Sequence, residues 1–227
     1  MSAGATIYEN GTYLAHVPEW HREDAPFKAG CIAGMLSRHP LIAKASVCEI
    51  GCGAGGILSQ LQTLWPRASF VGYDISPQAH GLSAEFASER CRFVLGDAFE
   101  DRTSYDVALV IDVIEHVEDC FAFLRQCREK AEIKLYHIPL DVHCSAILRG
   151  RNAWDSVGHL HLFSIESALK TLAHAGHRIV DYALTSGALG SPIRCARTRV
   201  ANLVRRALPD RLAARTIGGY SLLALTQ

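Results

Sequence analysis

Glycine recurs at every second position from residue 51 to residue 55, directly after a short apolar run. Gly51, Gly53 and Gly55 follow Val47 to Ile50, so a strand must stop and reverse within a few residues. Glycine permits a positive φ and lets the backbone approach a bound molecule closely. An ordinary strand-to-helix turn needs one glycine, and three therefore predict a loop that binds a cofactor.

The residue that precedes the glycines helps to choose among cofactors. Gly51, Gly53 and Gly56 also satisfy the dinucleotide pattern G-x-G-x-x-G, which would admit a nicotinamide or a flavin. Glu49 stands at the end of the strand, where its carboxylate would repel a pyrophosphate but could accept hydrogen bonds from a cationic, phosphate-free ligand. This position favours S-adenosylmethionine over a dinucleotide.

The segment Glu49-x-Gly51-x-Gly53-x-Gly55 resembles the first motif of the class I S-adenosylmethionine-dependent methyltransferases. Three further landmarks follow in that family's order, and the resemblance covers roughly residues 46–184. A second strand ends in Asp74, about 20 residues beyond the glycine turn. The acid that contacts a cofactor ribose stands at the same separation in such folds. The expected third strand, 91–95, leads into Gly96-Asp97-Ala98, and the fourth, 105–111, leads into Asp112-Val113-Ile114-Glu115-His116.

The resemblance implies a cofactor role for each of these segments. Asp74 would accept both ribose hydroxyls, and Asp97 would accept the adenine amino group. The methyl donor would be S-adenosyl-L-methionine and the product S-adenosyl-L-homocysteine. The complete set of expected cofactor positions is Glu49, Gly51, Cys52, Gly53, Gly55, Asp74, Ile75, Asp97, Ala98, Asp112 and Val113.

Histidines are the candidates for acid–base chemistry. Methyl transfer from a sulfonium is an in-line displacement, so the protein mostly aligns the reacting atoms and excludes water. An oxygen acceptor must also lose a proton, and histidine has a fitting pKa. His116 is the first candidate base because it follows the fourth strand, at the edge where open α/β sheets place ligands; a purely structural place beneath the cofactor is its alternative. His161 is the second candidate and His159 the third.

The elements that must position these residues alternate between apolar strands and helical patterns. This predicts a three-layer α/β sandwich with a seven-stranded, mostly parallel Rossmann-like sheet and an antiparallel last strand. The last three strands are expected at 133–138, 179–184 and 220–225. Helices are expected between the glycine turn and Pro66, from a first turn that contains Glu118 and Asp119, and after the capping residue Ser164.

Residues 1–40 are expected to form an N-terminal helical lid, and residues 41–227 the methyltransferase domain. Within the domain, 139–163 is the expected substrate loop, without strong periodicity, and 187–217 is a helical insert. Trp20, Trp154 and His159 are the candidate substrate contacts, although Trp20 could instead orient the helix entry. No acid or cysteine at ligand spacing accompanies the pair His159 and His161, so no metal is expected and packing or capping is the alternative.

The insert contains a basic amphipathic helix within 191–215. An apolar arc that includes Val200 and Leu203 lies opposite Arg194, Arg197, Arg205 and Arg206, so the helix is expected either to present a solvated outer face or to contact an anionic surface. The whole chain carries 23 basic and 23 acidic side chains, and this balance disfavours nucleic acid as a partner. Eight cysteines without C-x-x-C spacing, and no signal-like segment, indicate a cytoplasmic protein.

These features together predict an S-adenosylmethionine-dependent methyltransferase. The expected acceptor is an oxygen or nitrogen atom of a small-molecule, carrier-linked or cell-surface metabolite. Two alternatives come from other classes: an NAD(P)-dependent oxidoreductase, which would share the glycines and Asp74, and a non-catalytic cofactor-binding partner subunit, which would be expected to carry degraded motifs.

Overall fold

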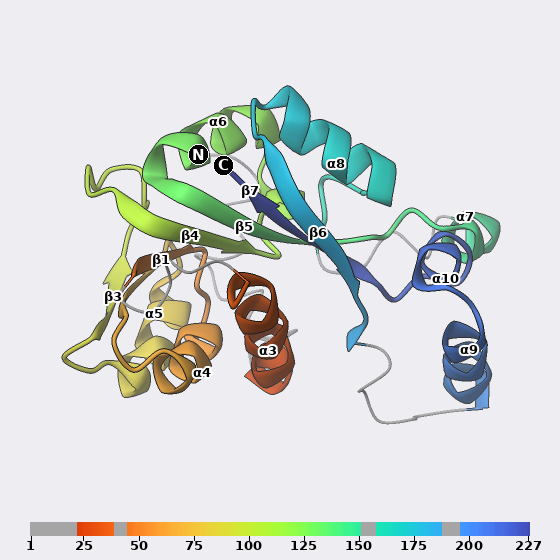
Figure 1. The fold of residues 1–227 in the computed structure, drawn as a ribbon, viewed down its shortest axis with the longest axis horizontal. Coiled ribbons are helices and arrows are strands. Elements are labelled where there is room, and N and C mark those ends of the chain that lie inside the picture. The colour runs from red at the N-terminus through yellow and green to blue at the C-terminus, as the bar shows by residue number, and fades with distance from the viewer. Residues whose placement is uncertain (1–21, 39–44, 151–157, 188–195) are drawn as a thin grey trace.

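A twisted sheet forms the middle layer of the protein, with helices on both of its faces (Figure 1). The computed structural model describes residues 22–38, 45–150, 158–187 and 196–227. Its seven strands are β1 (Ser46–Ile50), β2 (Ser69–Asp74), β3 (Cys91–Leu95), β4 (Tyr105–Ile111), β5 (Ala131–Pro139), β6 (Ile179–Thr185) and β7 (Ser221–Thr226).

The strands lie in the order β3-β2-β1-β4-β5-β7-β6. Strands β1 to β5 pair in parallel, whereas β7 runs antiparallel to both β5 and β6. The predicted seven-stranded sheet with an antiparallel last strand is therefore confirmed. The chain builds outward from β1 to β3 and then returns to the other side of β1, which leaves a switch point between β1 and β4. Ligands of open α/β sheets bind beyond the carboxyl ends of the strands at such a point.

The helices form the two outer layers. One face of the sheet carries α3 (Ala25–Leu36), α4 (Gly56–Leu64) and α5 (Pro77–Ser83), and the other carries α6 (Cys120–Lys130) and α8 (Ile165–His174) (Figure 1). Three more helices gather beyond one end of the sheet: α7 (Cys144–Arg149), α9 (Ala196–Ala207) and α10 (Asp210–Thr216). Short 3-10 turns lie at Arg22–Asp24 (η1), Ala84–Phe86 (η3) and Ile114–His116 (η4).

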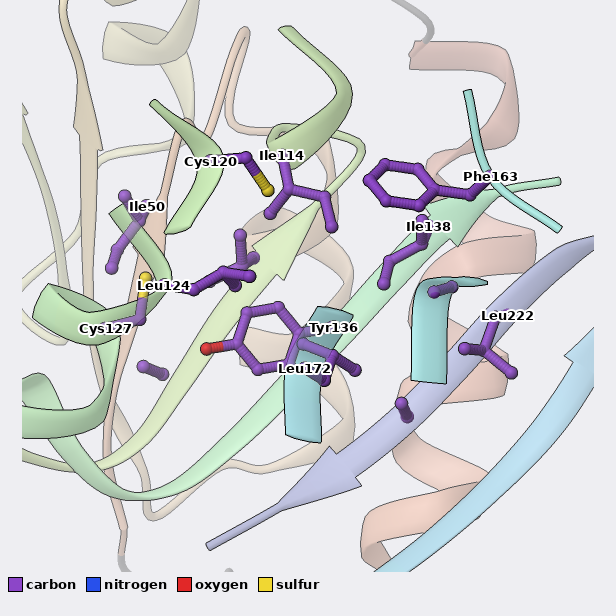
Figure 2. Close-up of a cluster of buried hydrophobic side chains, with 14 of the residues drawn as sticks. Ile50, Ile114, Cys120, Leu124, Cys127, Tyr136, Ile138, Phe163, Leu172 and Leu222 are labelled. Carbon is purple, nitrogen blue, oxygen red and sulfur yellow. The ribbon is translucent and has the colours of Figure 1, made fainter. Parts of the chain in front are cut away.

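Alternate residues of the central strands pack into two separate hydrophobic cores, one on each face of the sheet. Val47 and Val107 pack with the α3 and α4 side chains, whereas the next residues along, Cys48 and Ala108, belong to the core beneath α6 and α8. This follows from the period of two in a strand, since successive side chains point to opposite faces. Figure 2 shows the second core, in which Tyr136 lies among side chains that include Leu124 and Leu172.

Serine side chains cap two of the helices, α5 and α8, and the cap at Ser164 is the expected one. The Ser76 hydroxyl accepts from the Ala79 amide at 3.3 Å, and the Ser164 hydroxyl accepts from the Ser167 amide at 3.1 Å. The helix after β4 differs slightly from expectation. Asp119 is its N-cap and accepts from the Ala122 amide at 2.9 Å, so α6 begins at Cys120 and its first turn contains no acid.

Two segments differ from the sequence analysis. The expected substrate loop 139–163 contains helix α7, whose N-cap is His143. In α9 the expected apolar arc faces outward, because Val200 is 61% and Leu203 is 69% exposed. The side of α9 that faces the protein is polar instead. There Arg205 donates to the Gly218 carbonyl at 2.8 Å and to the Asn202 side chain at 2.6 Å.

The longest helices among the described residues, α3 and α9, have 12 residues each. Among those residues, none of the helices combines the length and the apolar composition that crossing a membrane requires.

Candidate active site

The glycine loop after β1 has a shape that only glycine adopts easily. Gly51, Gly53 and Gly55 have φ values of 72°, 53° and 76°. A Cβ atom on Gly51 would lie 2.7 Å from a methyl carbon of Val113, and one on Gly55 would lie 2.7 Å from the Phe93 ring. The loop is therefore pressed against the segment that follows β4, and its backbone reaches the switch point of the sheet.

Two carboxylates lie beside the loop, at the ends of β1 and β2, and one of them holds it. Asp74 accepts from the Gly53 amide at 2.7 Å and from the Ser76 amide at 2.8 Å. Burial raises the pKa of Asp74, and these two hydrogen bonds oppose the rise. Glu49 is 1% exposed, and its Oε2 has no hydrogen-bond partner among the described residues. Burial, followed by the charge of Asp74, raises the pKa of Glu49.

A cavity of about 900 Å³ opens beyond the carboxyl ends of the strands. This volume lies within the range of about 300–1,000 Å³ that is typical of small-ligand sites. Every expected cofactor position lines the cavity except Gly55, which packs against Phe93. Asp97 is among the lining residues, and its Oδ1 accepts from the Phe99 amide at 2.9 Å. Trp20 and Trp154 lie outside the described residues.

A charged network that the sequence analysis missed crosses the cavity wall. Asp112 accepts from the Lys28 ammonium at 2.7 Å and pairs with His137 Nδ1 at 2.6 Å. His137 Nε2 lies 3.0 Å from the Thr185 hydroxyl. Asp112 has a φ of 54°, which aspartate tolerates better than most residues. The only cue to Lys28 in the sequence is a cation within an otherwise apolar stretch of the expected lid helix.

The network shifts the pKa values of Asp112 and Lys28. Burial alone would raise the pKa of Asp112, but His137 and Lys28 outweigh it and bring the pKa below its usual value. Burial alone would lower the pKa of Lys28, and Asp112 reverses that effect, so the pKa is raised. Both groups are therefore charged at neutral pH, and the ion pair joins the first turn of α3 to the end of β4.

A second polar cluster faces the same cavity. The rings of His116 and His159 meet edge to face with their centroids 4.8 Å apart. His159 Nδ1 lies 2.7 Å from an Asp141 carboxylate oxygen, and His116 Nδ1 lies 3.2 Å from the Gly158 carbonyl. Glu115 lies beside them, 1% exposed, and neither of its carboxylate oxygens has a hydrogen-bond partner among the described residues. Burial, followed by the charge of Asp112, raises its pKa.

The first two candidate bases, His116 and His161, are in different environments. His116 lines the cavity, whereas His161 is not among the lining residues. His161 Nε2 lies 2.8 Å from the Val117 carbonyl, and the Leu160 and His161 amides both donate to the Glu115 carbonyl. His161 therefore fastens its segment to the η4 turn, and this connection brings His159 next to His116.

Comparison with known proteins identifies the family. Residues 29–182, more than half of the chain, match the family described as a methyltransferase domain, and the chain belongs to that family. The resemblance to the class I S-adenosylmethionine-dependent methyltransferases is thereby confirmed, and the oxidoreductase alternative is set aside.

Three known methyltransferases are similar to this chain in sequence or in structure. The ubiquinone biosynthesis O-methyltransferase of Nitrosospira multiformis is 33% identical over 106 residues, which cover 44% of this chain and 44% of that protein. Magnesium protoporphyrin IX methyltransferase of Synechocystis PCC 6803, solved with bound S-adenosylhomocysteine, has a TM-score of 0.69 at 16% identity and 97% and 98% coverage of the two chains. The plantazolicin methyltransferase, solved with the same product, has a TM-score of 0.65 at 16% identity and 99% and 94% coverage.

Neither the solved structures nor the curated relatives establish the acceptor of this chain. The solved structures are too distant in sequence to indicate more than the fold. The chain spans only 24–44% of the length of the first curated relatives that it matches. The acceptor and the roles of individual residues must therefore be argued from this chain's own site.

Proposed function

We propose that this chain transfers the methyl group of S-adenosylmethionine to an oxygen atom of a small-molecule acceptor. The observation that carries the proposal is the pairing of His116 and His159 on the wall of the cavity that also contains the glycine loop. The cavity is large for a single small ligand, and its two ends differ in chemistry. We assign the glycine loop with Asp74 and Asp97 to one end, and Glu115, His116 and His159 to the other; these residues all line the cavity except Gly55 of the loop.

The cofactor would occupy the glycine end. Asp74 holds the loop through the Gly53 amide, and each of its oxygens keeps further acceptor capacity for a ribose hydroxyl. Asp97 stands at the end of β3, where it would accept from the adenine amino group. Glu49 would accept a hydrogen bond from the cationic cofactor, and Asp112 would provide negative potential that favours binding of the sulfonium.

The acceptor would lie at the histidine end. Several of the curated relatives are named O-methyltransferases, which supports oxygen as the accepting atom. The acceptor oxygen must lose a proton as it attacks the methyl carbon, and we assign His116 and His159 to this step. His161 is fixed to the Val117 carbonyl and acts as a positioning residue.

The test is an acceptor screen with a matched set of variants. Purified protein, S-adenosylmethionine and a panel of phenols, hydroxy acids and amines are incubated, and products heavier by one methylene are sought by mass spectrometry. We expect hydroxyl compounds to be methylated. His116→Ala and His159→Ala should each lower kcat at least ~100-fold, the usual contribution of general acid–base catalysis, while cofactor affinity is retained. Methylation of amines alone would refute oxygen transfer.

We also propose that the outer face of α9 contacts an anionic surface. Val200 and Leu203 are exposed apolar side chains, and Arg199 and Arg206 on the same helix are exposed as well. Apolar groups flanked by arginines favour the boundary of an anionic membrane. Co-sedimentation with phosphatidylglycerol vesicles should be lost in a Val200→Ser, Leu203→Ser variant, and equal binding by that variant would contradict the proposal. The seven described cysteines are free thiols, which supports a cytoplasmic location.

A further inference from the structure

We propose that Glu115, His116 and His159 bind a divalent transition-metal ion at the acceptor end of the cavity. One ligand atom from each of the three residues lies within 4.8 Å of the others. Ligand atoms placed about 2.1 Å from an ion lie roughly 3 to 4 Å from one another, so a small contraction of the cluster would complete the site. The inference deepens the proposed function, since it concerns the same acceptor.

The buried Glu115 carboxyl group points to a missing partner. It is 1% exposed, and neither oxygen has a hydrogen-bond partner among the described residues. Leaving a buried polar group unsatisfied is costly, and a carboxylate is more costly than a neutral group. The charges that act on Glu115 include Asp112 and Asp141, which are negative, against the single positive charge of Lys28. A dication would supply both the missing contact and the missing charge.

The two histidines are oriented as metal ligands usually are. His159 faces the Asp141 carboxylate through Nδ1, and His116 faces the Gly158 carbonyl through Nδ1. If each Nδ1 carries the proton of its hydrogen bond, the lone pair of each neutral ring lies on Nε2. A carboxylate or carbonyl behind a ligating histidine fixes its tautomer and increases its basicity. Asp141 would therefore be a positioning residue for His159.

The ligand set indicates the kind of ion. Two imidazoles and one carboxylate suit zinc, iron(II), cobalt or manganese rather than calcium, which prefers oxygen ligands. Three protein ligands leave coordination positions open, as in catalytic rather than structural sites. All three residues line the cavity, so the open positions would be accessible to the acceptor.

The ion would explain how the acceptor loses its proton. A hydroxyl bound to a dication has a lowered pKa, and its proton would pass to solvent. The bound oxygen would then attack the methyl carbon, and the electron pair of the breaking carbon–sulfur bond would return to sulfur, leaving neutral S-adenosylhomocysteine. In this scheme His116 and His159 act through the ion rather than as free bases.

Calorimetry on chelator-treated protein tests the site directly. We expect the wild-type chain to bind one Zn²⁺ per molecule, and Glu115→Gln and His159→Asn each to weaken that binding at least ~100-fold. Asp141→Asn should weaken it ~10- to 100-fold, the usual effect of losing an outer-shell partner. His174→Asn is the matched control, because it changes an exposed histidine on α8 that is not a ligand of the proposed site and should leave the affinity for Zn²⁺ unchanged.

Two further readouts keep the outcomes separate. Circular dichroism establishes that each variant is folded, and the visible absorption of bound Co²⁺ should appear in the wild type and be lost in His159→Asn. Titration of S-adenosylhomocysteine into the same samples tests the proposed function independently. Cofactor binding without any Zn²⁺ binding would overturn the metal site alone, as would Zn²⁺ binding by Glu115→Gln at wild-type affinity. Loss of cofactor binding in the wild type would overturn the proposed function instead.

Discussion

Replacing Gly51 with Ala should destabilise the protein, whereas the same replacement at Gly34 should stabilise it. Gly51 has a φ of 72°, and its new Cβ would lie 2.7 Å from a methyl carbon of Val113. The left-handed conformation costs an alanine about 1–2 kcal/mol, and overpacking adds about 1–3 kcal/mol. A loss of roughly 3 kcal/mol is therefore expected, which corresponds to a fall in Tm of roughly 6 to 12 °C for a chain of this size.

Gly34 provides the matched control because it lies inside α3 with no atom within 4 Å of an added Cβ. Alanine there should raise the free energy of unfolding by about 1 kcal/mol, since glycine is a poor helix former. Urea denaturation followed by circular dichroism measures both variants against the wild type. If Gly51→Ala were as stable as Gly34→Ala, the argument that the loop backbone requires glycine would be refuted.

Two further predictions concern a partly buried charge and pH. Lys28→Met should lower the free energy of unfolding by about 1.5–3 kcal/mol, because the half-buried Asp112 carboxylate loses its ammonium partner and keeps only His137. Lys170→Met, on the exposed side of α8, should change it little, and equal effects would contradict this expectation. Burial lowers the pKa of His177 to about 4, so the unfolded chain takes up the proton first as the pH falls. Stability should drop by about 3 kcal/mol between pH 6.5 and pH 4 from this group. His177→Gln should remove that part of the slope and the exposed His174→Gln should keep it, whereas a slope unchanged in His177→Gln would refute the assignment.

The sheet and the cofactor end of the cavity follow from local sequence patterns. The third and fourth strands begin and end where their apolar runs do, at Cys91–Leu95 and Tyr105–Ile111. The acids at 49, 74 and 97 each stand at or just after the end of a parallel strand. Since the carboxyl ends of parallel strands share one edge, their proximity could be predicted without knowledge of any long-range contact.

The acceptor end depends on contacts between distant segments, so the sequence indicated His116 and His159 separately but not their grouping with Glu115 and Asp141. His159 seemed to lack an acidic companion because Glu115 belongs to another segment, and backbone hydrogen bonds from 160 and 161 bring the two together. The salt bridge between Lys28 and Asp112 forms only when α3 packs on the sheet, so no local pattern predicts it. In α9 the apolar Val200 and Leu203 face outward because the hydrogen bonds of Arg205 hold the polar side of the helix against the protein, and no local pattern in the sequence predicts those bonds.

Calorimetric titration of S-adenosylmethionine tests the central claim most directly. The wild-type chain should bind one molecule, and NADH should not bind. Asp74→Ala should weaken binding ~10- to 100-fold, which matches the loss of about 1.5–3 kcal/mol for hydrogen bonds to a charged group. Asp106→Ala, which removes a carboxylate that bonds Ser46 at the opposite end of the sheet, should bind like the wild type. Unchanged affinity in Asp74→Ala, or tighter binding of NADH than of S-adenosylmethionine, would contradict the account.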